Sequence, residues 1–251
     1  PRRRCRAGES IAGAGPRHAL SPGVAAAVLS PALAARRQNT SVAAMGPPLR
    51  VEMSNVLVLG GTGFVGRSLC ARLVARSGGA AGCVAVATRR AAHAKPVQML
   101  PTVQVIEANV HEPDALSELV KGRDAVVNLV AILHGSDAQF REVHEALPRK
   151  LAQACVQRGV RRVVHVSALG VSDDAPSSYL RSKAAGETVL KAAPLDLTLL
   201  RPSVIYGEGD RFLNLFASLQ AVLPVLPLAG AAARFQPVWV EDVAAAIAIC
   251  L

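Results

Sequence analysis

A tyrosine and a lysine, Tyr179 and Lys183, stand four residues apart in the segment SSYLRSKAAGE (177–187). Four residues are about one helical turn, so both side chains would project from one face of a helix. A tyrosine hydroxyl beside an ammonium group has a lowered pKa and can transfer a proton in catalysis. The same spacing also suits an amphipathic surface pair without chemical consequence, so the surrounding sequence has to decide.

A serine lies upstream of this pair, at the end of the apolar run RRVVHVSA (161–168). The run predicts a buried strand, and Ser167 would come at its carboxyl end, where open α/β sheets bind ligands. Its hydroxyl can orient a carbonyl or alcohol group, and Tyr179 can deliver or remove the proton. Lys183 can lower the Tyr179 pKa and hold a nicotinamide ribose. Ser167, Tyr179 and Lys183 are therefore the predicted catalytic residues.

A glycine loop lies in VLVLGGTGFVGRSL (56–69), between a predicted strand and a predicted helix. Gly60 permits a tight turn, Gly63 lets the backbone approach a pyrophosphate, and Gly66 permits close packing of helix on strand. The helix N-terminus would direct its N–H groups at the phosphates. This context favours a dinucleotide site over a glycine-rich turn without a ligand, which remains the alternative.

The end of the second predicted strand (83–88) carries two arginines, Arg89 and Arg90. An NAD-binding domain usually has an acidic residue near this point to hold the ribose hydroxyls. An acid would repel a 2′-phosphate, whereas an arginine can pair with it through two hydrogen bonds. The sequence therefore favours NADP(H) over NAD(H), although two solvated surface arginines would look the same.

The elements that position these residues follow from the hydrophobic pattern, in which short apolar runs alternate with segments of helical period. Continuous apolar runs indicate strands covered on both faces, which is typical of a parallel sheet between helices. We therefore expect a doubly wound α/β fold of the Rossmann type. The predicted strands are 55–60, 83–88, 103–108, 125–131, 161–168 and 197–202, and the predicted helices are 64–77, 112–121, 137–158 and 178–193.

Residues 203–251 do not continue this alternation of predicted strands and helices. They contain a loop (206–212), a predicted helix (213–222), an irregular apolar stretch (223–230), and a segment (236–250) that should turn helical from about Asp242. We expect a small substrate lobe here that is truncated, because the last predicted helix has no cap. The dinucleotide-binding domain would then span 53–202.

Residues 1–52 are rich in Ala, Arg, Gly and Pro, which favours a disordered extension. An Arg-rich targeting peptide and non-native upstream sequence are both open, and Met53 before the first strand favours the second. The extension holds eight Arg and two Glu, so most of the net charge of +10 lies there. The remaining chain has no basic stripe that would indicate specific nucleic-acid binding. Its apolar runs are too short to predict a transmembrane segment.

Taken together, the motifs resemble the short-chain dehydrogenase/reductase superfamily, and RPSVIYGEGDRFLN (201–214) resembles its extended, epimerase/dehydratase branch. SSYLRSKAAGE and QPVWVEDVA (236–244) narrow the resemblance to the NADPH-binding accessory subunits of respiratory complex I and their bacterial relatives. The resemblance implies a set of cofactor-binding residues: Gly60, Thr62, Gly63, Phe64, Val65, Gly66, Arg89, Arg90, Asn109, Val130, Ala131, Tyr179, Lys183, Pro202 and Val204. No metal ligands are implied.

Two functions follow from this resemblance. The first is a reductase or epimerase that acts on a carbonyl or hydroxyl group, or on a quinone, through Ser167, Tyr179 and Lys183. The second is an accessory or assembly subunit of complex I that holds the nucleotide without turnover, with respiratory complex subunits as partners. The expected location is cytoplasmic, or peripheral to the inner membrane and on the matrix side in a eukaryote.

Overall fold

The computed structural model describes residues 55–77, 84–210, 212–214, 218, 221 and 234–251. All of them belong to one compact unit, Arg50–Leu251. The predicted extension (1–52) lies outside the described residues, as do the stretch 223–230 and most of the predicted helix 213–222.

Six strands in the described part of the chain form one parallel sheet, in the order β3-β2-β1-β4-β5-β6. They are β1 (Val56–Leu59), β2 (Val84–Thr88), β3 (Val103–Glu107), β4 (Ala125–Asn128), β5 (Arg162–Val166) and β6 (Asp196–Leu200). The order reverses between β1 and β4, which places a topological switch point at the carboxyl ends of these two strands. The predicted doubly wound fold is confirmed.

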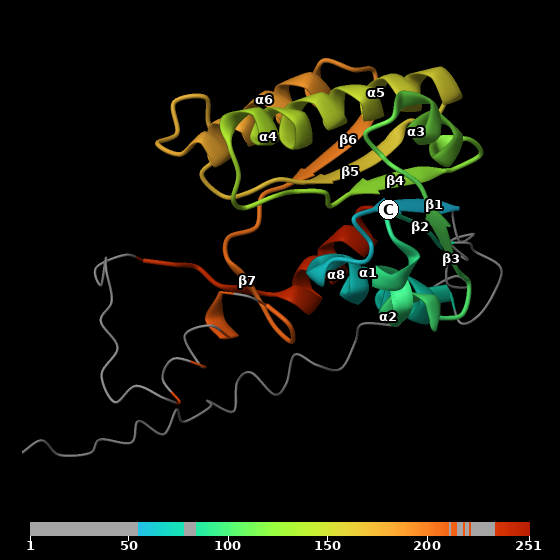
Figure 1. Ribbon diagram of the computed structural model, residues 1–251, viewed down its shortest axis with the longest axis horizontal. Helices are drawn as coiled ribbons and strands as arrows, with labels where there is room; N and C mark the ends of the chain where they lie inside the picture. The colour runs from blue at the N-terminus through green and yellow to red at the C-terminus, as the bar shows by residue number, and fades with distance from the viewer. Residues whose placement is uncertain (1–54, 78–83, 211, 215–217, 219–220, 222–233) are drawn as a thin grey trace, which may run out of the picture. The chain divides into compact units, whose positions relative to one another are not determined.

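Helices cover both faces of this sheet, as Figure 1 shows. One face carries α1 (Phe64–Ser77), α2 (Lys95–Gln98) and α8 (Val240–Ile249), and the other carries α3 (Pro113–Val120), α4 (Asp137–Arg141), α5 (Leu147–Arg158) and α6 (Ser178–Lys191). Val56 and Val58 pack toward the first set of helices, whereas Leu57 and Leu59 pack toward the second. Because both faces are covered, every position of β1 is apolar and buried.

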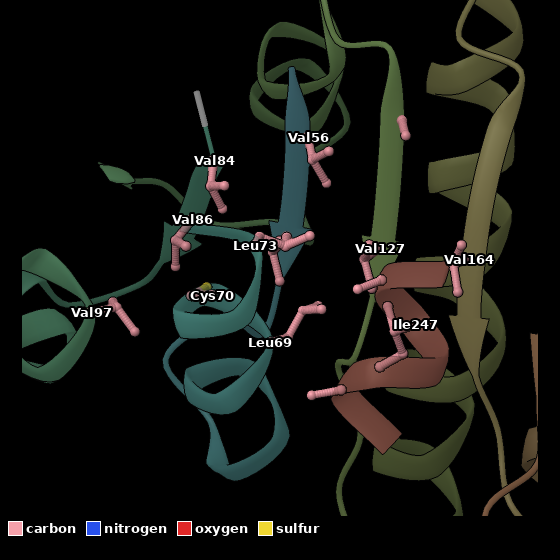
Figure 2. Packing of buried hydrophobic residues seen from close by; sticks show 14 of the residues in the cluster. Val56, Leu69, Cys70, Leu73, Val84, Val86, Val97, Val127, Val164 and Ile247 are labelled. Atoms are coloured by element: carbon pink, nitrogen blue, oxygen red, sulfur yellow. The ribbon is translucent and has the colours of Figure 1, made fainter. Parts of the chain in front are cut away.

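The core between the sheet and α1 also contains α8 (Figure 2). Leu69 of α1 and Ile247 of α8 are fully buried there, against Val127 of β4 and Val164 of β5. The helix that the sequence places in a separate substrate lobe thus packs into the core of the main sheet. It begins at Val240, two residues before the predicted start, and directly after the strand pair β7 (Ile205–Tyr206) and β8 (Val238–Trp239).

The helix predicted over 137–158 is interrupted. A π-helical turn, Glu142–Ala146, separates α4 from α5, and the Leu147 N–H donates to the Glu142 carbonyl. Pro148 explains the interruption, because it has no N–H to donate to the His144 carbonyl oxygen in a regular α-helix.

Replacing Ile247 with Ala should lower the free energy of unfolding by about 2–5 kcal/mol, because it leaves a cavity between α8 and the sheet. Ile249→Ala is the matched control on the same helix, since Ile249 is 79% exposed, and it should change stability by less than about 0.5 kcal/mol. Urea unfolding followed by circular dichroism compares the two variants. Equally small effects would contradict the packing of α8 in this core.

Candidate functional site

The loop between β1 and α1 is shaped by its glycines. Gly60 has a φ of +82°, a left-handed conformation that other residues rarely adopt. A Cβ on Gly66 would lie 2.4 Å from the Gly60 carbonyl oxygen, so the first turn of α1 lies directly on the loop. The Gly63 N–H donates to the same carbonyl at 3.0 Å. The remaining predicted residues of the loop, Thr62, Phe64 and Val65, form its end and the first turn of α1.

The glycine loop lies against the end of β4. A Cβ on Gly60 would lie 3.2–3.3 Å from atoms of Leu129 and Val130, so Val130 lies beside the glycine loop at the switch point, and Ala131 follows it. Fully buried Asn128 shapes this segment, because its Oδ1 accepts from the Val130 N–H at 3.1 Å. Its Nδ2 donates to Nδ1 of His165 on β5, also at 3.1 Å. Asn128 was not among the predicted site residues. A single amide in an otherwise apolar strand is the sequence signal that could have identified it.

Tyr179 and Lys183 lie on α6, which begins after Ser177, whose side chain accepts from the Leu180 N–H. Lys183 is 2% exposed, and its Nζ donates to the carbonyl oxygen of Val166, the last residue of β5, at 2.8 Å. The pair is therefore not a surface couple. It lies at the carboxyl edge of the sheet, the edge that also carries the glycine loop.

The electrostatics of the pair differ from the expectation that Lys183 lowers the Tyr179 pKa. Burial raises the pKa of Tyr179 above its ordinary value. Burial also lowers the pKa of Lys183 to about 8, although the charge of Glu187 partly opposes this. The difference arises because desolvation disfavours both the phenolate and the ammonium, and because the Lys183 ammonium is directed at a backbone carbonyl.

A buried carboxylate, Glu187, lies one turn further along α6. Arg201 donates to both of its oxygens, with Nε at 2.8 Å from Oε1, and Lys191 donates to Oε2 at 3.1 Å. Burial opposes ionisation of Glu187, but the hydrogen bonds from Arg201 and Lys191, together with the charge of Arg201, outweigh it and lower the pKa to about 2. The buried Ser167 hydroxyl, by contrast, has no hydrogen-bond partner among the described residues.

His144 is another residue of the site that was not among the residues predicted from the sequence. It is buried on the π-helical turn, and its ring centroid lies 5.4 Å from that of Tyr179. Its Nε2 accepts from the Ile132 N–H at 3.1 Å, and its Nδ1 lies 2.9 Å from Ser182 Oγ. Burial, with the charge of Lys183, lowers the pKa of His144 to about 4, so the ring is neutral at neutral pH.

Arg89 and Arg90 are exposed at the end of β2. The Arg90 N–H donates to Thr88 Oγ1 at 3.3 Å, which fixes the backbone where the strand ends. An acidic residue of the neighbouring strand lies close to this strand end. Glu107 of β3 pairs in register with Thr88, and its Oε2 accepts from the Ala91 N–H at 3.3 Å.

The other predicted cofactor residues lie at the same edge of the sheet. Asn109 follows β3, and its amide bonds locally, to the His111 N–H at 3.2 Å and to Glu112 at 3.3 Å. The Pro202 carbonyl accepts from the Leu169 N–H, and the Val204 carbonyl accepts from the Val238 N–H, each at 2.9 Å. The first bond holds the segment after β6 beside the segment that follows β5, and the second holds it beside β8.

The described residues contain no group of His, Cys, Asp or Glu side chains that could hold a metal ion. None of the helices within 55–77, 84–210 and 234–251 combines the length and the apolar character needed to cross a membrane.

The fold and the glycine loop define a dinucleotide-binding protein of the Rossmann type. A family profile described as NAD(P)H-binding matches residues 60–215, and the chain belongs to this family, within the epimerase/dehydratase-like short-chain dehydrogenases/reductases.

Three relatives illustrate the range of similar proteins. The "NADH dehydrogenase [ubiquinone] 1 alpha subcomplex subunit 9, mitochondrial" of Mus musculus is 32% identical over 84% of this chain and 57% of its own length. The "Ceramide reductase" of Caulobacter vibrioides is 33% identical over 78% of this chain and 60% of its own. A dTDP-glucose 4,6-dehydratase from Streptomyces venezuelae, solved with NAD bound, is 27% identical, with a TM-score of 0.66 over 77% and 70% of the two chains. The chain thus spans about three-fifths of the two curated relatives.

The buried histidines predict how stability depends on pH. Burial lowers the pKa of His144 to about 4 and of His165 to about 3, both from an ordinary value of 6.5. Below about pH 6.5 these two histidines therefore bind protons in the unfolded state but stay neutral in the folded state. The free energy of unfolding should fall as the pH drops below 6.5. Two such groups give a slope of up to about 2.7 kcal/mol per pH unit.

Urea unfolding at pH 7, 6 and 5 measures this slope. The variant His134→Gln, which replaces an exposed histidine, should follow the same pH dependence as the unmodified chain. A free energy of unfolding that stays constant from pH 7 to pH 5 would show that the two buried rings take up protons without cost.

Proposed function

We propose that this chain binds NADP(H) at the carboxyl edge of the sheet and reduces or epimerises a carbonyl or hydroxyl group through Ser167, Tyr179 and Lys183. One observation carries the proposal: the Lys183 ammonium is buried and held at 2.8 Å from the Val166 carbonyl, one helical turn from Tyr179. A buried cation beside a buried phenol, at the ligand edge of an α/β sheet, is suited to proton transfer.

The residues present fit a dinucleotide. The contact between Gly66 and Gly60 brings the N-terminus of α1 onto the loop, so that its free N–H groups can receive a pyrophosphate. An ammonium group has three N–H donors, and Lys183 uses one of them within the described residues. The others suit the hydroxyls of a nicotinamide ribose. A bound nicotinamide would donate or accept a hydride.

Each catalytic residue would have a separate role. Tyr179 would give its proton to the substrate oxygen in reduction, since burial raises its pKa and keeps the phenol protonated. Lys183 would stabilise the phenolate that remains. Ser167 would orient the substrate oxygen from the end of β5, because its buried hydroxyl has no hydrogen-bond partner among the described residues.

The preference for NADP(H) over NAD(H) rests on Arg89 and Arg90, whose side chains are exposed at the end of β2. A 2′-phosphate can pair with either guanidinium. Glu107 of the neighbouring strand would work against this preference, but its carboxylate already accepts from the Ala91 N–H. Asn109, Val130, Ala131, Pro202 and Val204 would border the remainder of the cofactor.

Replacing Arg90 with Ala should raise the Kd for NADPH about tenfold, which corresponds to a loss of about 1.4 kcal/mol of binding free energy. The Kd for NADH should stay unchanged. The loss of a partner for the 2′-phosphate is the physical reason. Fluorescence titration of both nucleotides measures the effect, with Arg89→Ala as a second variant. Arg149→Ala, which removes a surface arginine paired with Glu145, is the control. An equal loss for NADH and NADPH in both variants would overturn the preference.

A second function is favoured by the similarity to the mouse complex I subunit. In that role the chain holds the nucleotide as an accessory or assembly subunit, with subunits of a respiratory complex as partners. It would then lie on the matrix side of the inner membrane in a eukaryote, and in the cytoplasm or peripheral to the membrane in a bacterium. Residues 203–251 would contribute to the lobe that receives a substrate or a partner under either function.

Tyr179→Phe separates the two functions, because it removes the proton donor and preserves the ring. NADPH oxidation is followed over a panel of carbonyl compounds, which includes long-chain ketones, and of quinones. We expect turnover that falls by about 10²–10⁴-fold in the variant, with the Kd for NADPH within about threefold. Binding without Tyr179-dependent turnover would contradict the enzyme and leave the accessory role. No binding of NADPH or NADH would contradict both.

A further inference from the structure

His144 takes part in a chain of hydrogen bonds whose direction can be assigned. Its Nε2 accepts from the Ile132 N–H at 3.1 Å, so this nitrogen carries no proton. A neutral imidazole has one donor and one acceptor nitrogen, and Nδ1 therefore donates to Ser182 Oγ at 2.9 Å. The Ser182 hydroxyl in turn donates to the Tyr179 carbonyl oxygen at 2.7 Å. These hydrogen bonds join the segment after β4 to the backbone of Tyr179.

The His144 ring also contacts the side chain of Tyr179. The two ring planes meet at 84°, an edge-to-face arrangement with centroids 5.4 Å apart. Phe140, one helical turn before His144, stacks on the imidazole at 5.6 Å and meets the Tyr179 ring at 6.2 Å. The tyrosine ring is thus packed by two rings from the preceding helical segment, which restricts its rotamers.

The backbone fixes the position of His144 itself. Its carbonyl oxygen lies so close to α6 that a Cβ on Gly186 would come within 1.9 Å of it. The π-helical turn, which the absent N–H of Pro148 favours, brings this carbonyl and the imidazole toward α6 on the same side. Such turns occur frequently at functional sites.

We propose that His144 is a positioning residue, which holds Tyr179 at the place where it transfers its proton and ties α6 to the nicotinamide side of the sheet at Ile132. The proposal deepens the enzyme function proposed above and rests on it for its catalytic part. His144 is not itself the proton carrier, because its one N–H donates to Ser182 Oγ and the Ser182 hydroxyl donates to the Tyr179 carbonyl, so that neither proton is directed at the phenol.

Three variants test the role. His144→Phe keeps an aromatic ring against Tyr179 and removes both hydrogen bonds of the imidazole. Ser182→Ala removes the hydroxyl that links His144 to the Tyr179 carbonyl. His144→Asn keeps an N–H group near the position of Nδ1. Thr188→Ala is the matched control, since the Thr188 hydroxyl likewise bonds a carbonyl of α6, that of Ala184 at 3.1 Å. The variants are made in a Tyr206→Phe parent, in which Tyr179 is the one remaining tyrosine of the two in the chain.

Two readouts are compared with the parent. The first is kcat for a substrate found in the panel, beside the Kd for NADPH. The second is the ring resonance of ¹³C-labelled Tyr179 without nucleotide. In His144→Phe and Ser182→Ala we expect kcat to fall about 10–100-fold, the Kd to stay within about twofold, and the resonance to shift or broaden. His144→Asn should recover most of kcat, and Thr188→Ala should resemble the parent.

The failures can be told apart. If Ser182→Ala resembles Thr188→Ala in both kcat and resonance, the positioning role is wrong even though the enzyme turns over. The second failure is that neither the parent nor any variant turns over a substrate. If the Tyr179 resonance then still changes in Ser182→Ala and not in Thr188→Ala, His144 positions Tyr179 and the proposed enzyme function is wrong. If His144→Phe does not fold, Ser182→Ala still tests the positioning role, because the Ser182→Ala variant keeps the imidazole in place.

Discussion

The cost of burying one ammonium group, that of Lys183, determines how β5, α6 and β6 meet. Burial lowers the pKa of Lys183 to about 8, which corresponds to about 3 kcal/mol against the charged form. This net value already includes the opposing charge of Glu187, one turn along α6, and the ammonium also donates to the Val166 carbonyl at the end of β5. Glu187 is itself buried and needs Arg201, which follows β6. A single buried cation thus fixes one helix against two strands.

The neighbouring helical segment completes this arrangement from the other side. α6 could not approach the π-helical turn if position 186 carried a side chain, because the His144 carbonyl occupies that space. The close approach brings the rings of Phe140 and His144 against Tyr179 and places Ser182 between His144 and the backbone. Lys183 and Tyr179, neighbours on one helix face, are therefore held by different elements: the lysine by β5, and the tyrosine by the segment between α4 and α5.

Much of this fold follows from residue patterns that are local in sequence. The continuous apolar runs predicted all six strands, since a strand covered on both faces needs no polar alternation. The spacing of Gly60, Gly63 and Gly66 predicted a loop in which helix and strand touch, and the spacing of Tyr179 and Lys183 predicted a shared helix face. Each of these signals lies within one element or one turn.

The features that could not be predicted depend on contacts between elements. Glu107 lies across from Thr88 because of the register of β2 and β3, which the hydrophobic pattern of either strand does not specify. His144 occurs in a segment that reads as an ordinary helix, and its role depends on a π-helical turn and on Gly186, 42 positions away in the chain. The raised pKa of Tyr179 depends on burial by rings from that same segment.

The two proposed functions place different demands on this arrangement. Under the proposed functions, holding a nucleotide would require the glycine loop, the end of β2 and the Lys183 ammonium. It does not require the tyrosine ring to be held in one orientation. A buried neutral imidazole whose ring packs on Tyr179, and whose hydrogen bonds lead to Ile132 and through Ser182 to the Tyr179 backbone, is easier to explain where the phenol must meet a reacting oxygen. The environment of His144 therefore supports the reductase or epimerase over the accessory role.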